Sequence, residues 1–370
     1  MKKNNQIRAD CNQPLLMTGN EAMAESAVRS GCQFYAGYPI TPQNELTAYM
    51  AKRMPEEKRV FIQAESELAA INMVYGASAV GRRAMTSSSS PGISLKQEGI
   101  SYLAGSELPA VIINVVRGGP GLGNIASAQS DYFQATRGGG HGDYYTPVLA
   151  PAGVQEASEL VSCAFDLADF YRTPVLILAD AIVGQMMEPV TLKAQSAAKQ
   201  RGLAKGGRTA HSARKDWALG KKKKKPQNII RSLFIKEGAL EAHNQKLLTK
   251  WNKIKSQQQR HSTYKIKDAD YLIVAYGSQA RIVQAAVDSL RKEKIKVGLF
   301  RPISLWPYPV KALKRAAKGV KKILVVEQSL GQMVEDVKLT LATKNIYFMG
   351  RAGGGIPQET EIINWIKKNL

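Results

Sequence analysis

Continuous apolar runs that alternate with helical segments are the feature that most constrains how this chain can fold. The runs at residues 32–38, 108–116 and 173–180 are typical of strands, and the segments 67–81 and 154–172 are typical of helices. Strands that are apolar along their whole length are buried on both faces, as in a parallel sheet covered by helices. The alternation therefore predicts an α/β fold whose first domain is built on a parallel sheet.

Three short loops follow the predicted strands of this domain. They are Tyr38–Thr41, Ser88–Gly92 and Arg117–Gly121. Ligands of parallel sheets bind at the carboxyl ends of the strands. We therefore expect the three loops to converge in space and to form a binding site. The serine-rich stretch at residues 87–90 is expected to be a loop whose hydroxyl groups line the rim of that site.

The length of 370 residues exceeds what one hydrophobic core serves well, so more than one domain is expected. The strand–helix alternation of residues 1–195 stops at a basic stretch, residues 196–267, and returns in residues 268–370. The middle stretch predicts an exposed linker that leads into a helical hairpin or arm. The sequence thus predicts a larger α/β domain, a basic insert and a smaller α/β domain.

Most of the formal charge of +22 lies in the basic insert. Residues 199–267 contain 20 Lys or Arg and three acids, so they carry +17 and leave +5 for the rest of the chain. The run Lys221–Lys225 repels itself and favours a solvated segment. Nucleic-acid binding through this run is the alternative. No aromatic residues interleave with the lysines, which disfavours nucleic acid as a partner.

Cysteine spacing and hydropathy exclude several classes of protein. Cys11, Cys32 and Cys163 are far apart and have no neighbouring histidine, so they predict no zinc or iron–sulfur site in this chain. Unpaired cysteines fit a reducing compartment. No apolar run reaches the ~18 residues of a membrane span, and the N-terminal segment lacks the apolar core of a signal peptide. We therefore expect a cytoplasmic protein without a membrane partner.

Two acidic residues, Glu65 and Glu67, stand at the start of the helix predicted at residues 67–81, which is rich in small side chains. A carboxylate carried into such an apolar helix is costly to bury unless it is paired or hydrogen-bonded. Glu67 is therefore a candidate catalytic acid. The alternative is that Glu67 caps its helix, since acids suit the first turn. Glu65 is expected to take the capping role.

Several motifs resemble those of one enzyme family. GYPITP at 37–42, the SEL acid, the Ser/Gly loop and VVRGGPG at 115–121 are similar to the pyrimidine-binding domain of 2-oxoacid:ferredoxin oxidoreductases. FRPISLWPYP at 300–309 and VVEQSLGQM at 325–333 resemble the transketolase C-terminal-like domain of these enzymes. The insert, with DWALG and GALEAHNQKL, is similar to subunits that oxidise 2-oxoisovalerate (3-methyl-2-oxobutanoate) or 2-oxoglutarate. The resemblance covers nearly the whole chain.

The resemblance implies an alpha subunit that contributes half of an active site. In this family thiamine diphosphate lies between two subunits, and the beta subunit holds its diphosphate and Mg²⁺ through a GDG…N motif, which this chain lacks. The implied reaction converts a 2-oxoacid, coenzyme A and oxidised ferredoxin into an acyl-CoA, CO₂ and reduced ferredoxin. A gamma subunit and a ferredoxin-like delta subunit would complete the complex, and [4Fe–4S] clusters would reside on partner subunits.

The resemblance also assigns roles to single residues. Glu67 matches the acid that hydrogen-bonds the ring nitrogen N1′ of the aminopyrimidine and so promotes loss of the proton from thiazolium C2. Thr41 would hydrogen-bond the 2-oxoacid, and Arg117 would hold its carboxylate. The alternatives are a turn hydroxyl for Thr41 and an ion pair with a partner subunit for Arg117. The residues expected to line the cofactor pocket are Tyr38, Pro39, Ser89, Ser90 and Gly92.

Two other functions stay open from the sequence. A different thiamine enzyme, transketolase-like and independent of ferredoxin, would share the motifs, and a nucleic-acid-associated protein would use the basic insert. Among the 2-oxoacids, 2-oxoisovalerate is the first choice and 2-oxoglutarate the second. The motifs assign neither the residues that bind coenzyme A nor the subunit stoichiometry.

Overall fold

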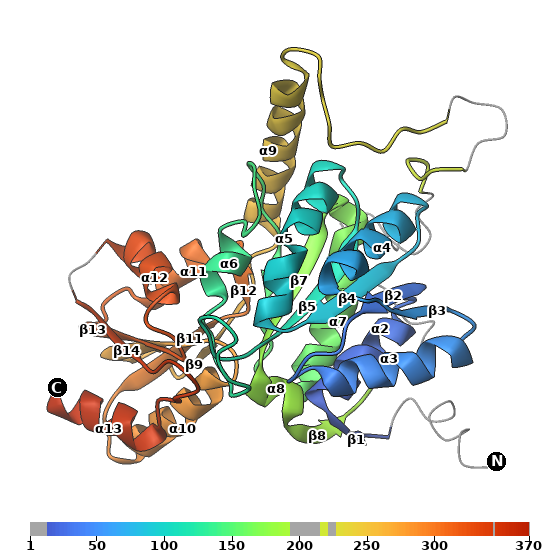
Figure 1. Ribbon diagram of the computed structural model, residues 1–370. Coiled ribbons are helices and arrows are strands. Elements are labelled where there is room, and N and C mark those ends of the chain that lie inside the picture. Colours follow the sequence, from blue (N-terminus) through green and yellow to red (C-terminus); the bar gives the residue numbers. More distant parts are fainter. Residues whose placement is uncertain (1–12, 193–214, 221–226, 343–344, 370) are drawn as a thin grey trace, which may run out of the picture.

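A computed structural model of the protein describes residues 13–192, 215–220, 227–342 and 345–369. These residues form two α/β domains, each built on its own sheet (Figure 1). The fold class that the alternation of strands and helices predicts is confirmed. A third, two-stranded sheet pairs β1 (Leu15–Thr18) antiparallel with β8 (Met187–Val190).

The N-terminal domain is built on a seven-stranded sheet with the order β12-β6-β7-β5-β4-β2-β3. Its strands are β2 (Phe34–Gly37), β3 (Val60–Gln63), β4 (Ala84–Ser88), β5 (Ala110–Val116), β6 (Val148–Leu149), β7 (Pro174–Asp180) and β12 (Ser304–Trp306). All pair in parallel except β12, which is antiparallel to β6 at the edge. β4, β5 and β7 are buried at every position, because helices cover both faces of the sheet.

The helices of this domain pack in two layers. They are α2 (Gly19–Arg29), α3 (Asn44–Glu56), α4 (Glu67–Ala79), α5 (Ser90–Gly105), α6 (Tyr132–Thr136), α7 (Val154–Tyr171) and α8 (Ala181–Gln185). α4 and α5 pack together on one face of the sheet, and α2 packs with α3 and α7 on the other (Figure 1). This arrangement brings the start of α4 and the start of α5 to the carboxyl edge of the strands.

The C-terminal domain has a five-stranded sheet with the order β14-β13-β10-β11-β9. Its elements are β9 (His261–Tyr264), β10 (Tyr271–Val274), α10 (Gln279–Lys292), β11 (Val297–Pro302), α11 (Val310–Ala316), β13 (Lys322–Glu327), α12 (Met333–Leu341), β14 (Ile346–Gly350) and α13 (Glu359–Lys368). Alternate residues of β10 face opposite sides. Ile273 packs with α10 and α13, whereas Leu272 and Val274 join the core shared with the N-terminal domain.

One helix, α9 (Ala239–Gln257), occupies the described part of the basic insert. It projects from the body of the molecule (Figure 1), as the predicted arm would. Its inner face packs on the N-terminal domain through Leu247, Trp251 and Ile254, which are buried. The chain then continues directly into β9, so a strand of the C-terminal sheet lies within the range expected to be linker.

Part of the positive charge of the insert is held by ion pairs within the chain. Lys246 and Lys250 of α9 lie 2.5 and 3.3 Å from the two carboxylate oxygens of Glu107. Lys215 lies 2.7 Å from Asp169. These pairs fasten the insert to the N-terminal domain. The lysine run Lys221–Lys225 lies outside the described residues.

Buried polar groups join the two domains near the carboxyl edges of both sheets. Gln129 donates from Nε2 to the backbone oxygen of Tyr276 at 2.9 Å, and its Oε1 accepts from the backbone N–H of Gln328 at 3.1 Å. Asp180, at the end of β7, accepts from the backbone N–H of Ser278 at 2.8 Å. Because these groups satisfy one another out of contact with water, they fix how the domains pack.

Candidate active site

The loops that follow β2, β4 and β5 meet at the carboxyl edge of the large sheet. Arg117, just after β5, donates from Nη1 to the backbone oxygen of Thr41 at 3.0 Å. Its backbone N–H donates to Ser90 Oγ at 3.1 Å, and Ser90 Oγ lies 3.2 Å from the Arg117 carbonyl oxygen. The convergence predicted from the strand ends is therefore confirmed.

The serine-rich stretch is not the predicted loop. β4 ends at Ser88 and α5 begins at Ser90, so Ser89 alone joins strand to helix. Pro91 lies in the first turn of α5, where its missing N–H costs no hydrogen bond. The buried hydroxyl of Ser89 has no hydrogen-bond partner in the part of the chain that the structure describes. The direct connection turns Ser87–Ser89 into the interior instead of the rim.

Gln43 organises the turn after β2, and no sequence pattern identified it. Its Oε1 accepts from Ser87 Oγ at 2.6 Å and from Thr47 Oγ1 at 3.1 Å, while its Nε2 donates to the backbone oxygen of Tyr38 at 3.3 Å. Tyr35 OH lies 2.7 Å from the same Ser87 hydroxyl. Burial raises the pKa of Tyr35 to about 12, so this network stays uncharged.

The predicted capping role of Glu65 is wrong. Ser66 is the N-cap of α4, and its hydroxyl accepts from the backbone N–H of Ala69 at 3.2 Å. Serine is among the preferred residues at this position, because its short side chain reaches the free N–H groups of the first turn. Glu65 is exposed to solvent, and Glu67, the first residue of the helix, is buried with 5% of its surface exposed.

The carboxyl group of Glu67 is enclosed but sparsely hydrogen-bonded. One long contact, 3.4 Å from Ser88 Oγ to Oε1, is its hydrogen bond to the described residues. Gly92 packs directly against it: a Cβ at this position would lie 2.0 Å from Ser88 Oγ and 2.4 Å from Glu67 Oε1, so the absence of a side chain makes room for the carboxyl group itself. A buried carboxylate with spare acceptor capacity is costly unless a further donor approaches it.

A second residue that sequence reasoning missed is Lys96. Its side chain is completely buried, and its Nζ lies 3.4 Å from the backbone oxygen of Glu67. Its spacing could have identified it, because Lys96 lies four residues after Gly92 and therefore on the same face of the helix.

Arg117 and Thr41 are partly engaged with backbone groups. The Arg117 side chain is 9% exposed, and its Nη2 donates to the backbone oxygen of Leu122 at 3.1 Å. Its Nε is buried and has no hydrogen-bond partner among the described residues. Thr41 Oγ1 accepts from Asn44 Nδ2 at 3.1 Å. Thr41 therefore makes the contact expected of a turn hydroxyl, which is the alternative to substrate binding. Arg117, in contrast, keeps N–H groups that the described residues do not use.

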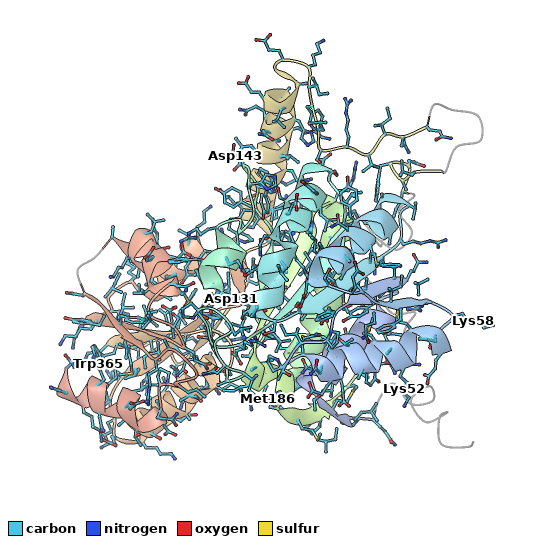
Figure 2. All side chains as sticks on the ribbon, viewed as in Figure 1. Lys52, Lys58, Asp131, Asp143, Met186 and Trp365 are labelled. Carbon is cyan, nitrogen blue, oxygen red and sulfur yellow. The ribbon has the colours of Figure 1, made fainter. Side chains whose placement is uncertain are left out.

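Three more side chains surround these groups. Tyr38 and Pro39 are exposed, at the outer side of the turn after β2. Asp131, near the boundary between the two domains (Figure 2), accepts from Asn114 Nδ2 at 2.8 Å. Burial raises the pKa of Asp131, while hydrogen bonds from Ser90 and Asn114 oppose that rise. No sequence pattern pointed to Asp131 or Asn114.

The donor set fits a polar organic ligand better than a metal ion. Ser89 Oγ, Arg117 Nε and the Glu67 carboxyl are polar groups whose hydrogen-bonding capacity the described residues leave unfilled at this edge of the sheet. The described residues contain no group of three or more His, Cys, Asp or Glu side chains that could hold a metal. Cys32 is a buried free thiol whose pKa burial raises to about 12, and Cys163 is half-buried.

Among the helices in the described ranges, none combines the length and apolar character that crossing a bilayer requires.

Two family models together match most of the chain. The one described as "Pyruvate flavodoxin/ferredoxin oxidoreductase, thiamine diP-bdg" matches residues 25–253. The one described as "Pyruvate:ferredoxin oxidoreductase core domain II" matches residues 269–362. The first contains the candidate site, so the expectation of a thiamine diphosphate-binding domain is confirmed.

Curated relatives agree over nearly their full length. Ketoisovalerate oxidoreductase subunit VorB of Methanothermobacter marburgensis is 44% identical over 353 residues, which cover 95% of this chain and 97% of the relative. 2-Oxoglutarate synthase subunit KorA of Methanothermobacter thermautotrophicus is 37% identical over 369 residues, with the same coverages.

Solved structures support the same assignment. A 2-oxoglutarate:ferredoxin oxidoreductase from Magnetococcus marinus, solved with 2-oxoglutarate, coenzyme A and succinyl-CoA bound, matches 96% of this chain and 65% of its own at a TM-score of 0.85 and 27% identity. A split-gene transketolase matches 95% of both chains at a TM-score of 0.56 and 15% identity, which shows a shared fold alone. The chain belongs to the 2-oxoacid:ferredoxin oxidoreductase family, as one subunit of a multi-subunit enzyme.

Proposed function

We propose that this chain is the alpha subunit of a thiamine diphosphate-dependent enzyme that oxidises 2-oxoisovalerate, with 2-oxoglutarate as the second choice. The overall reaction would turn the 2-oxoacid, coenzyme A and oxidised ferredoxin into an acyl-CoA, CO₂ and reduced ferredoxin. The observation that carries the proposal is the buried, sparsely bonded carboxyl of Glu67 at the carboxyl edge of the sheet. The higher identity to the ketoisovalerate subunit, 44% against 37%, supports the order of substrates.

Glu67 is the proposed catalytic residue. Thiamine diphosphate, when bound, supplies the electron sink for the pair left when CO₂ departs. Glu67 would share one proton with the aminopyrimidine ring nitrogen across a hydrogen bond, because its carboxyl group has acceptor capacity that the described residues do not fill. The enclosing protein excludes water from this bond, which makes it stronger than it would be in solution. Ser89, Ser90, Tyr38 and Pro39 would line the pocket around it.

Arg117 and Thr41 are the proposed substrate-binding residues. Each Nη of Arg117 gives one hydrogen to a backbone oxygen, which orients the guanidinium and leaves its Nε–H free. A carboxylate can accept two parallel hydrogen bonds from such a fixed fork. The Thr41 hydroxyl still has its own proton to donate, since Asn44 uses it as an acceptor.

Replacing Arg117 by Lys tests this role. Lysine keeps the positive charge but loses the planar fork, so the KM for the 2-oxoacid should rise by about 10- to 100-fold. The KM for coenzyme A should change little. Steady-state kinetics on the assembled enzyme measure both constants. Equal changes in the two KM values would contradict a specific contact with the 2-oxoacid.

Partner subunits complete the proposed enzyme. A beta subunit would hold the diphosphate and Mg²⁺, and gamma and ferredoxin-like delta subunits would carry the remaining domains and the [4Fe–4S] clusters. The relatives are named as subunits, which supports a heteromeric assembly. Residues 1–195, 196–267 and 268–370 would act as the cofactor domain, the insert and the transketolase C-terminal-like domain. The complex is proposed to work in the cytoplasm.

Reconstitution tests the activity and the choice of substrate. The chain is expressed together with its partner subunits, and reduction of a dye is followed with 2-oxoisovalerate, 2-oxoglutarate or pyruvate and coenzyme A. We expect the highest kcat/KM with 2-oxoisovalerate. A higher value with 2-oxoglutarate would reverse the order of substrates. An assembled, iron-free complex that transfers two-carbon units would instead support the transketolase-like alternative.

A further inference from the structure

A completely buried lysine lies beside the proposed catalytic acid. Lys96 of α5 has no exposed surface, and its Nζ lies 3.4 Å from the backbone oxygen of Glu67. No carboxylate of a described residue forms an ion pair with this Nζ. Lys250, which is also largely buried, has Glu107 Oε1 at 3.3 Å. A buried lysine without a bonded carboxylate costs stability, so its presence points to a function.

The packing of α5 on α4 directs the Lys96 side chain toward the backbone of Glu67. Gly92 and Lys96 are one turn apart on the same face of α5. Gly92 faces the carboxyl group of Glu67, and Lys96 faces its carbonyl oxygen. Farther along this face, a Cβ at Gly99 would lie 2.5 Å from Ile71 of α4. The two helices are thus pressed together over this whole face, and the ammonium cannot turn out to solvent.

The charge of Lys96 is coupled to that of Glu67. Burial lowers the pKa of Lys96 from its ordinary 10.5 to about 8, and the negative charge of Glu67 opposes this shift. β4 presents uncharged serines here. The other charged groups of the site are engaged elsewhere, Arg117 with backbone oxygens and Asp131 with Asn114. At neutral pH, which is below its pKa of about 8, Lys96 is therefore mainly a buried cation next to Glu67.

We propose that Lys96 is a positioning residue for the reaction: its charge favours placing the shared proton on the ring nitrogen, and its hydrogen bond holds the first turn of α4. The inference rests on the proposed function of Glu67. A proton shared between Glu67 and a ring nitrogen resides on the nitrogen only if the proton affinity of Glu67 is low enough. The positive charge of Lys96 lowers that affinity, so removing the charge would leave the proton on Glu67.

Two substitutions of Lys96 separate charge from hydrogen bonding. Lys96→Met removes the charge and the hydrogen-bond donor while keeping a side chain of nearly the same length. Lys96→Gln keeps a hydrogen-bond donor but removes the charge. In the assembled enzyme, both variants should shift the acid limb of the pH profile of kcat/KM to higher pH by at least about one unit. At pH 6.5 this shift should lower kcat/KM by roughly tenfold relative to wild type. Above pH 8 the wild-type lysine is itself neutral, so the variant and wild-type profiles should converge.

Thermal unfolding of the assembled complex without cofactor gives a second readout. Because the folded-state pKa is below the ordinary value, the unfolded chain binds a proton that the folded chain lacks between about pH 8 and 10.5. Wild-type stability gains from this group as pH rises through that window. Lys96→Met should therefore have a higher Tm than wild type at pH 7, and the difference should shrink by pH 10.

Lys52→Met is the matched control, since Lys52 is an exposed lysine of α3 (Figure 2) and should change neither readout. Unchanged acid limbs in both Lys96 variants would overturn the inference. A lower Tm for Lys96→Met at pH 7, with an unshifted profile in Lys96→Gln, would mean a purely structural lysine. Failure of the proposed function is distinguishable, because it would appear as full activity in Glu67→Gln, independently of Lys96.

Discussion

Replacing Glu67 by Gln is expected to lower 2-oxoacid-dependent turnover by at least about 10²-fold while the complex still assembles. Glutamine has nearly the same shape, so it can keep the 3.4 Å contact with Ser88 Oγ and fill the same enclosed space. It cannot hold an exchangeable carboxyl proton against a ring nitrogen. Turnover, together with exchange of the thiazolium C2 proton in deuterated water, measures the loss at the step that the side chain serves.

Glu65→Gln is the matched control for this experiment. Glu65 lies two residues away, is exposed, and does not cap α4, a role that Ser66 takes. The same change of charge at this position should leave turnover within about twofold of wild type, because surface charges contribute little. Full activity of Glu67→Gln would refute the catalytic role. Equal losses in the two variants would point to an effect of net charge instead.

Much of the fold follows from local sequence because parallel strands have a strong signature. β5 and β7 are apolar at nearly every position, since both faces of the sheet are covered. β9 and β12 lack that signature. His261–Tyr264 is polar and half-exposed at a sheet edge, and Ser304–Trp306 is only three residues long. Their pairing partners are set by the packing of whole domains, which a local pattern does not contain.

Some residues of the candidate site could likewise be predicted from the sequence, and others could not. The meeting of Thr41, Ser90 and Arg117 follows from a general rule about strand ends, so the sequence predicts it. Gln43 and Lys96 act through the direction of long side chains. That direction depends on which helix faces which, and glutamine or lysine on a helix is usually a solvated residue. The serine-rich stretch differs from the predicted loop for a related reason: the Ser87 hydroxyl has buried hydrogen-bond partners, which a serine in an exposed loop would not need.

Replacing Gly92 by Ala is expected to reduce turnover by about 10²-fold, close to the effect of removing the acid itself. The new Cβ would lie 2.0 Å from Ser88 Oγ and 2.4 Å from Glu67 Oε1, well inside van der Waals contact. Either the carboxyl group or the first turn of α5 must move by about 1 Å, and a misplacement of that size costs about 10²-fold in rate. Steady-state turnover and cofactor affinity, from calorimetry on the assembled complex, measure the effect.

Gly76→Ala on α4 supplies the control for this glycine. Gly76 lies inside a helix, and a Cβ there would meet nothing within 4 Å. Alanine should therefore leave turnover unchanged and raise stability by up to ~1 kcal/mol, as it does at open helix positions. If Gly92→Ala kept turnover within about threefold of wild type while still folding, the position in which Gly92 holds the Glu67 carboxyl group would not matter for catalysis. The geometric basis for assigning Glu67 would then be lost, even with the family assignment intact.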